Sequence, residues 1–219
     1  MFSGVFAAWR EVRSLFLALA TASLLALLRR QSKLFLLASS LLAWLCYFFR
    51  DPDRFPPATG PEWILAPADG KVTAVELIHE PQIFKGSARR ISIFLSLFDV
   101  HVQRAPYQGD ISAIHYEAGG FAPAFLKDTH LNEYNLITLS TPHGLIGVKQ
   151  IAGILARRIV CWPSPDQFVI RGERLGLIKF GSRVDLLLPP SVEVLISVGE
   201  QVYGGQTIVA RWPVEEQTW

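Results

Sequence analysis

Two uncharged, apolar runs near the start of the chain constrain its fold more than any other feature. They cover residues 14–28 and 34–49, and the basic segment 29–33 separates them. Each run is shorter than the roughly 20 residues with which a helix spans a bilayer. Each is also too uniformly apolar to be one face of a soluble amphipathic helix. The pattern therefore predicts two short helices in a membrane-associated hairpin.

Two alternatives concern this apolar region. A cleaved signal peptide would use Arg10 and Arg13 as its basic flank, but a second apolar run follows and no small-residue cleavage site lies between the two runs. Basic residues occur before, between and after the runs. The positive-inside rule therefore leaves open whether the hairpin crosses the membrane or enters and leaves on one side.

The segment 49–57 ends the helical region, because it contains two charged pairs and three prolines. From Trp63 onward the pattern changes to short β-type runs. Because no alternation of strands and helices appears, a parallel doubly wound sheet is not expected. We predict a mainly β (α+β) fold, with a helical hairpin and linker over residues 1–55 and a catalytic β domain over residues 56–219.

The run from Arg90 to Phe98 has the clearest strand pattern. Its apolar residues at 91, 93, 95 and 97 alternate with Ser92 and Ser96, which predicts one face toward the core, while Phe94 and Phe98 suggest partial cover of the other face. Gly86-Ser87, between basic residues, is interpreted as the tip of a hairpin.

Charge and cysteine content exclude several classes of function. The formal net charge of +2 argues against a dedicated nucleic-acid-binding protein. Cys46 and Cys161 have no metal-ligand spacing and are interpreted as small buried hydrophobic residues. The histidines show no paired spacing for a metal site, so no metal is predicted.

Two segments at the ends of the β region echo each other. Pro67-x-x-Gly70-x-Val72 and the glycine-containing segment 198–208 resemble the two halves of a lipoyl- or biotinyl-carrier-like β-sandwich. This echo predicts a barrel-sandwich character. It also raises a rival function, a carrier domain modified on lysine. Such carriers need a lysine at a hairpin tip in a motif such as Met-Lys-Met, and the only methionine of this chain is Met1.

Three residues are candidates for chemistry. Gly181-Ser182 lies between two strand-like runs, where glycine permits a tight turn and Ser182 is expected to be accessible. Asp69 lies in Pro-Ala-Asp-Gly, a pattern typical of a turn. His101 follows the patterned strand, and a single histidine there is commonly structural. Taken separately, each of the three has an ordinary structural interpretation.

Taken together, the segments that contain these residues resemble phosphatidylserine decarboxylase of the short, pyruvoyl-dependent class. The resemblance extends from Phe48 to about Ala210. It rests on residues 48–54 (FFRDPDR), 66–72 (APADGKV), 99–106 (DVHVQRAP), 149–160 (KQIAGILARRIV) and 172–185 (GERLGLIKFGSRVD). One departure is Asn132-Glu133-Tyr134-Asn135, where the family has arginine at the third position. If that arginine contacts substrate, Tyr134 puts the contact in doubt.

The resemblance implies a self-cleaving proenzyme. Ser182 Oγ would attack the carbonyl of Gly181, with His101 as base and Asp69 orienting it in a Ser-His-Asp arrangement. The resulting ester would break by β-elimination. The dehydroalanine left at position 182 would be hydrolysed to a pyruvoyl group with loss of ammonia. The products would be a β chain of residues 1–181 and an α chain of residues 182–219, associated as a heterodimer.

The resemblance also implies the reaction and its setting. The pyruvoyl ketone would form a Schiff base with the amine of phosphatidylserine, carbon dioxide would leave, and His101 would protonate the carbanion to give phosphatidylethanolamine. Arg50, Arg54, Arg104, Arg157 and Arg158 could pair with the lipid phosphate, with Arg104, Arg157 and Arg158 as the candidates, although each taken singly is interpreted as a surface or strand-edge arginine. The expected location is a cell membrane, with the catalytic domain on the cytoplasmic side.

Three questions stay open from the sequence. The substrate could be a different serine-headed lipid. The chain could also be a membrane-anchored, lipoyl-like binding module without catalysis, although intact Asp69, His101 and Ser182 argue against this. Homo-oligomerisation is the third open question.

Overall fold

The structure is a computed structural model, and it describes residues 8, 10–57, 60–120, 132–153, 158–179 and 182–213. The chain forms two compact units, Met1–Asp53 and Arg54–Trp219. They are called the helical unit and the β unit below, and each is considered by itself.

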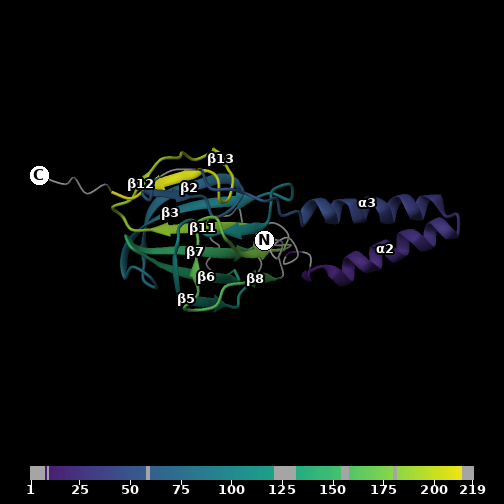
Figure 1. Ribbon diagram of the computed structural model, residues 1–219, viewed down its shortest axis with the longest axis horizontal. Coiled ribbons are helices and arrows are strands. Elements are labelled where there is room, and N and C mark those ends of the chain that lie inside the picture. The colour runs from purple at the N-terminus through teal and green to yellow at the C-terminus, as the bar shows by residue number, and fades with distance from the viewer. Residues whose placement is uncertain are drawn as a thin grey trace, which may run out of the picture. The chain divides into compact units, whose positions relative to one another are not determined.

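The helical unit contains α2 (Arg13–Leu28) and α3 (Ser32–Phe48), which lie side by side and antiparallel (Figure 1). The chain reverses between them at Arg30, whose φ of 54° is left-handed. Midway along the pair, the hydroxyl oxygens of Ser23 and Ser39 lie 2.7 Å apart, so a hydrogen bond joins the two apolar helices. The two helices correspond to the two uncharged runs of the sequence.

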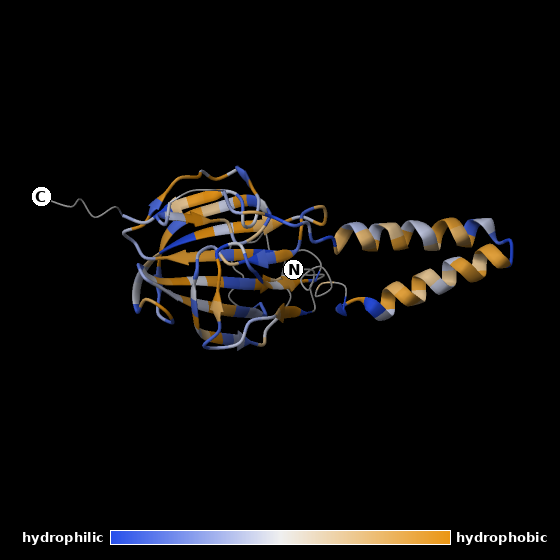
Figure 2. Ribbon diagram, in the orientation of Figure 1, coloured by the Kyte–Doolittle hydropathy of each residue, from blue (hydrophilic) through white to orange (hydrophobic). Residues whose placement is uncertain are grey.

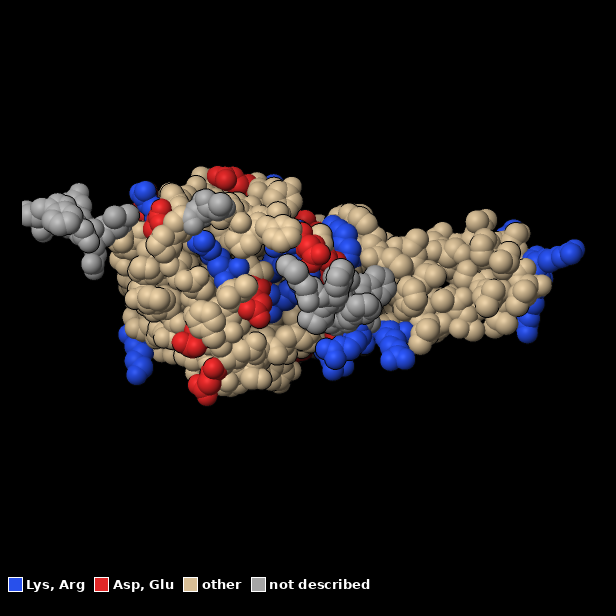
Figure 3. Space-filling model, viewed as in Figure 1, with Lys and Arg blue, Asp and Glu red and all other residues tan. Residues whose placement is uncertain are grey.

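The outward surfaces of α2 and α3 are apolar along their length. Leu24, Leu28, Leu36 and Leu37 are each more than half exposed. Figure 2 shows hydrophobic residues over most of both helices, and Figure 3 shows Lys and Arg only at the two ends of the pair. Within the described residues, neither helix combines the length and the apolar character needed to cross a membrane.

The β unit is mainly β, as the sequence predicted. Its strands are β1 (Trp63–Leu65), β2 (Gly70–Glu80), β3 (Gly86–Leu95), β4 (Val102–Arg104), β5 (Gly109–Glu117), β6 (Tyr134–Thr141), β7 (Gly144–Ala152), β8 (Ile159–Cys161), β9 (Phe168–Val169), β10 (Arg174–Ile178), β11 (Ser182–Leu188), β12 (Glu193–Val194), β13 (Gln201–Val202) and β14 (Ile208–Arg211).

In the described part of the chain these strands form three sheets. The large sheet is a curled half-barrel of eight strands in the order β13-β2-β3-β11-β7-β6-β5-β9 (Figure 1). The β10 sheet has the order β4-β10-β8, and the terminal sheet has the order β1-β14-β12. Neighbouring strands pair antiparallel in all three. Strand β11 therefore lies inside the large sheet, between β3 and β7.

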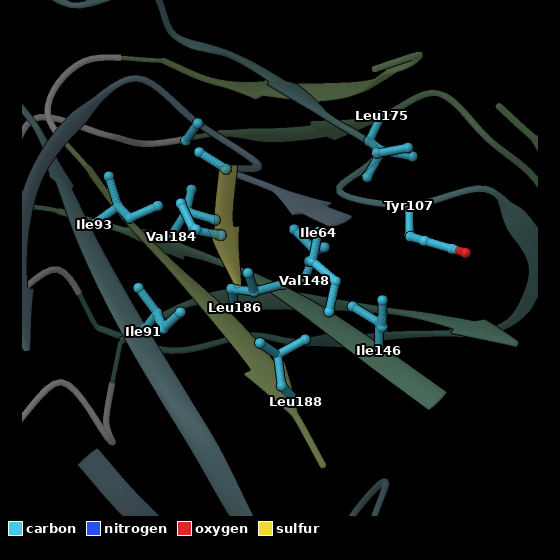
Figure 4. Packing of buried hydrophobic residues seen from close by; sticks show 14 of the residues in the cluster. Ile64, Ile91, Ile93, Tyr107, Ile146, Val148, Leu175, Val184, Leu186 and Leu188 are labelled. Carbon is cyan, nitrogen blue, oxygen red and sulfur yellow. The ribbon is translucent and has the colours of Figure 1, made fainter. Parts of the chain in front are cut away.

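Alternation along β11 defines the two faces of the large sheet. Val184, Leu186 and Leu188 point to the inner face, where they join a core that includes Ile64 of β1 and Leu175 of β10 (Figure 4). Residues 183, 185 and 187 point to the opposite, outer face. Burying each large aliphatic side chain contributes about 1.5–3 kcal/mol. The core therefore joins the large sheet to the two smaller ones.

The structure corrects the end of the predicted strand 90–98. Residues 91, 93 and 95 do face the core, but β3 ends at Leu95. There the backbone N–H and the hydroxyl of Ser96 both donate to the Asp99 carboxylate, at 2.8 and 2.7 Å, and turn the chain. Phe98 is consequently in the turn and 69% exposed rather than on a strand face.

The β2–β3 hairpin tip also differs from the prediction. Gly86 and Ser87 pair within the ladder with Glu80 and His79, so the tip lies at residues 81–85. The Glu80 carboxylate accepts three backbone N–H groups of this tip, from residues 82, 83 and 84. These hydrogen bonds to the Glu80 carboxylate stabilise a tip at residues 81–85, before Gly86.

The two cysteines were predicted to be buried. Cys46 and Cys161 are free thiols that are each only partly buried. Burial is still sufficient to raise the pKa of the Cys161 thiol, so that it stays protonated at neutral pH.

Candidate active site

The predicted catalytic residues lie toward one end of the large sheet. In its antiparallel ladder, Lys71 at the start of β2 is opposite Phe94 near the end of β3, and Leu95 is opposite Ser182 at the start of β11. Ser182 is in turn opposite Ala152 at the end of β7. Because β3 separates β2 from β11, the start of β2 and Ser182 are two strand spacings apart, about 10 Å.

Ser182 is fully buried, at 0% exposure, and not accessible as predicted. The physical reason is its place in a central strand, with its side chain on the inner face beside Val184. Its Oγ makes no hydrogen bond to any described residue. A buried hydroxyl without a partner costs about 1–3 kcal/mol of desolvation, so structure alone does not explain a serine at this position.

The cleavage site lies at the edge of the described residues, since Phe180 and Gly181 are outside them. Strands β10 and β11 belong to different sheets. The chain is thus in the β10 sheet before this site and in the large sheet after it, and the predicted tight turn at Gly181 lies outside the described residues.

His101 follows the Ser96–Asp99 turn and is 2% exposed. Its Nδ1 lies 3.0 Å from the carbonyl oxygen of Asp99. When Nδ1 donates to that carbonyl, Nε2 has the lone pair and can accept a proton. The carbonyl oxygen of His101 accepts the backbone N–H of Ile178 at 3.4 Å, which places His101 beside the end of β10, four residues before Ser182.

Asp69 is buried just before β2, and its carboxylate is held by Arg54 and Gly204. Arg54 Nη2 donates to Oδ2 at 2.6 Å, Nη1 donates to Oδ1, and the N–H of Gly204 donates to Oδ1 at 2.9 Å. The sequence suggested that Asp69 orients His101, and that Arg54 binds lipid phosphate. In the structure Arg54 is engaged by Asp69, and the acceptor at Nδ1 of His101 is the Asp99 carbonyl.

The three arginines proposed for the lipid phosphate have different positions. Arg104 is buried, and its Nη1 donates to the carbonyl of Gly172 at 3.2 Å. Arg158 is exposed, whereas Arg157 is outside the described residues. Their role in phosphate binding stays a prediction.

Tyr134, the departure from the expected Asn-Glu-Arg-Asn, points to the outer face. It is opposite Ile151, and Ile151 is opposite Arg183. Its hydroxyl accepts a hydrogen bond from Gln82 Nε2 at 3.0 Å, and Lys149 Nζ lies 3.7 Å from its ring centroid. The side chain at position 134 is therefore on the opposite face of the large sheet from Ser182.

Three buried amides were missed by the sequence analysis: Gln150 and Asn135 on the inner face of the large sheet, and Gln103 on β4 of the β10 sheet. A signal was available for one of them. Gln150 occupies an inward position of β7 in the series Ile146, Val148, Gln150, Ala152, where the other members are apolar. A glutamine in such a series indicates a buried hydrogen-bond partner elsewhere in the fold.

Comparison with known protein families places the chain among carboxy-lyases whose cofactor is a covalent pyruvoyl group derived from a serine. The matching family is phosphatidylserine decarboxylase, whose sequence model covers residues 41–210, and the chain belongs to it. The protein is thus an enzyme that converts phosphatidylserine to phosphatidylethanolamine. Membership also means that the mature protein consists of two processed chains.

Proposed function

We propose that Ser182 is the serine from which the pyruvoyl group is made, by cleavage between Gly181 and Ser182. The observation that supports this is the buried Ser182 Oγ, which makes no hydrogen bond to any described residue. Such a group fits a residue that will lose its hydroxyl, because a ketone at this position leaves no hydrogen-bond donor unsatisfied. Before cleavage the same oxygen is the nucleophile that attacks the carbonyl of Gly181.

His101 is the proposed base for that attack. Donation from its Nδ1 to the Asp99 carbonyl leaves Nε2 able to take the proton of Ser182. In turnover the pyruvoyl carbonyl supplies the electron sink for loss of carbon dioxide. His101 then returns a proton to the substrate carbon, and its burial keeps water from competing for that position.

Asp69 supports this end of the sheet through its pair with Arg54. Both side chains are buried, so the negative charge of Asp69 is neutralised beside the site instead of being exposed to solvent. We propose that Asp69 acts on His101 through the shape and charge of this pair. Asp69→Asn keeps the shape and removes the charge, and should slow self-cleavage less than His101→Ala does.

The α chain begins with β11, and this explains how the processed chains stay together. From Ser182 to Leu187, each residue pairs with β3 on one side and β7 on the other, and both of these strands belong to the β chain. Cleavage before Ser182 therefore removes one peptide bond and leaves the whole ladder in place.

The decisive experiment is intact mass under denaturing conditions on wild type beside Ser182→Ala. We expect two wild-type fragments, split between residues 181 and 182, with a blocked N-terminus on the smaller one, and an uncleaved variant. A wild-type chain that stays whole after prolonged incubation with phosphatidylserine vesicles would overturn the proposal. Product analysis with phosphatidylserine beside a second serine-headed lipid tests substrate choice, and equal turnover of both would refute specificity for phosphatidylserine.

We also propose the barrel-sandwich arrangement for the two echoing segments. Gly70 is opposite Val202 and Lys71 is opposite Gln201, so the segments pair with each other. Gly205 N–H also donates to the carbonyl of Ala66 at 2.8 Å. Paired segments from the start and the end of the β unit are what such a fold requires.

The helical unit is the proposed membrane attachment, with the β unit on the cytoplasmic side of a cell membrane. The exposed leucines of α2 and α3 support attachment, and the free thiols Cys46 and Cys161 fit a reducing compartment. Changing Leu24, Leu28, Leu36 and Leu37 to Glu together should release the full chain from anionic vesicles in a flotation assay. Leu77→Glu, at an exposed leucine of β2, is the control. Protease digestion of inverted and right-side-out vesicles tests the side.

A further inference from the structure

A chain of buried amides leads from the inner face of the large sheet to Gln103 of β4 and ends on His101. Asn135 Nδ2 donates to Gln150 Oε1 at 2.9 Å, and Gln150 Nε2 donates to Gln103 Oε1 at 2.8 Å. Gln103 Nε2 then donates to the carbonyl oxygen of His101, also at 2.8 Å. All four residues are at most 3% exposed. The hydrogen bonds form one directional series, since Gln150 and Gln103 each accept through the side-chain oxygen and donate through the side-chain nitrogen.

The amide chain passes Gly176 of β10 at a point where a larger residue would have no room for its side chain. Gly176 is opposite Gln103 of β4 in one direction and opposite Cys161 of β8 in the other. A Cβ atom at position 176 would lie 3.0 Å from Gln150 Nε2 and 2.1 Å from the carbonyl oxygen of Val160. Only glycine therefore lets β10 pass this closely over the Gln150–Gln103 hydrogen bond.

The amide chain connects β7, which pairs with β11 at Ser182, to the backbone of His101. Gln150 is on β7 opposite Val184 of β11, two residues from the pair formed by Ala152 and Ser182. Its other end is the backbone of His101. The series thus ties the position of His101 to the strand pair that holds Ser182, and it does so with neutral groups that add no charge to the buried face.

We propose that Gln103 and Gln150 are positioning residues, which hold His101 in reach of Ser182 for self-cleavage and for turnover. This inference rests on the proposed roles of Ser182 and His101. Its physical basis is the sensitivity of catalysis to geometry, because a displacement of about 1 Å at a reacting group can cost about a hundredfold in rate. The backbone of His101 follows a short turn, and Gln103 Nε2 donates to its carbonyl oxygen.

The test uses the full chain with Gln103→Met and Gln150→Met, which keep side-chain length and remove the amide. We expect each variant to cleave itself at least about tenfold more slowly than wild type, followed by mass spectrometry over time. After maturation, kcat for phosphatidylserine should fall with KM unchanged. Gln82→Met is the matched control, because its amide donates to Tyr134 on the outer face, and it should cleave at the wild-type rate.

Gln150→Glu adds a second measurement, the pH dependence of the cleavage rate, which should stay flat if Gln150 only fills space in the core. A protonated carboxylic acid can donate to Gln103 Oε1 and accept from Asn135, whereas a carboxylate cannot donate. The cleavage rate of Gln150→Glu relative to wild type should therefore rise as the pH is lowered from about 8 to about 6, since burial raises carboxyl pKa values into this range. The ratio for Gln150→Met should not change.

The outcomes separate the two proposals. If His101→Ala does not cleave while both Met variants cleave within about twofold of wild type, the positioning role is wrong and the proposed function stands. If His101→Ala cleaves like wild type, the proposed role of His101 as base fails, and the positioning role fails with it, whereas Ser182→Ala still tests the cleavage site. Thermal unfolding in the Ser182→Ala background monitors folding. Should a Met variant be unfolded, the pH response of Gln150→Glu decides the question, and a flat ratio overturns the inference.

Discussion

On the inner face of β11, Ser182 is buried with a hydroxyl that makes no hydrogen bond to any described residue, and two residues along the ladder Val184 is opposite Gln150, a neutral amide. On the outer face of the same strand, Arg183 Nε and Nη2 donate to the two oxygens of Asp185, each at 2.7 Å. Both faces bury polar groups, but only the outer face satisfies them with opposite charges. The difference teaches that changes to the polar groups of the inner side should act on rate, whereas changes to the outer-face ion pair should act on stability.

The largest effect is expected at His101 on the inner side. His101→Ala removes the proposed proton acceptor, so self-cleavage should slow by about 10²–10⁴-fold. A time course on denaturing gels measures it, beside circular dichroism of the same samples. Cleavage that falls only in proportion to folded protein would contradict a catalytic role and would break the comparison between the faces.

The outer-face ion pair should give the largest loss of stability. Asp185→Asn removes the carboxylate that pairs with the buried guanidinium of Arg183, which should lower the free energy of unfolding by about 3–5 kcal/mol. Urea unfolding in the Ser182→Ala background measures this on an uncut chain. The double variant Arg183→Met, Asp185→Leu should lose less than the single one, and the folded fraction of Asp185→Asn should still cleave at the wild-type rate.

Two glycines compare how closely other segments approach the large sheet, Gly176 of β10 on the inner side and Gly147 of β7 on the outer face. In Gly176→Ala the new Cβ would meet the backbone carbonyl of Val160 at 2.1 Å, which cannot move without disturbing β8. In Gly147→Ala, on the outer face, it would meet the terminal Cδ1 of Ile83 at 2.4 Å, which can rotate away. Thermal melts should show a loss of about 1–3 kcal/mol for Gly176→Ala and a smaller one for Gly147→Ala. Equal losses would refute the tight approach at Gly176.

The smallest expected effect is a pH dependence from Lys149, which lies on the outer face. Burial lowers the pKa of Lys149 below the ordinary lysine value of 10.5, with Asp185 and Glu80 opposing the shift. Between the folded and unfolded pKa values the unfolded chain binds more protons, so stability rises with pH in that window. The unfolding free energy of wild type relative to Lys149→Met should therefore increase as the pH approaches 10.5. A decrease would mean that the charged amine is stabilised by its neighbours.

Part of the fold and of the site could be predicted without coordinates. The alternation at Ile91, Ile93 and Leu95 correctly identified the inner face of β3. The prediction failed at Phe98, because Asp99 ends the strand through hydrogen bonds to Ser96 that no periodicity reveals. It failed again for the exposure of Ser182, since a Gly-Ser pair looks the same in sequence whether the strand that follows is at an edge or inside a sheet.

The sequence by itself determined the two helices that precede the β region, the β character of the rest, and the family, because hydrophobic patterning and motif order are local properties of a chain. The tertiary structure alone decided which strands flank β11, that Arg54 pairs with Asp69, and that Gln150 meets Gln103 across 47 residues. The physical reason is that a residue's pattern shows which face of its element is buried. The partner it meets there depends on the order of the strands and on where glycine allows two sheets to approach.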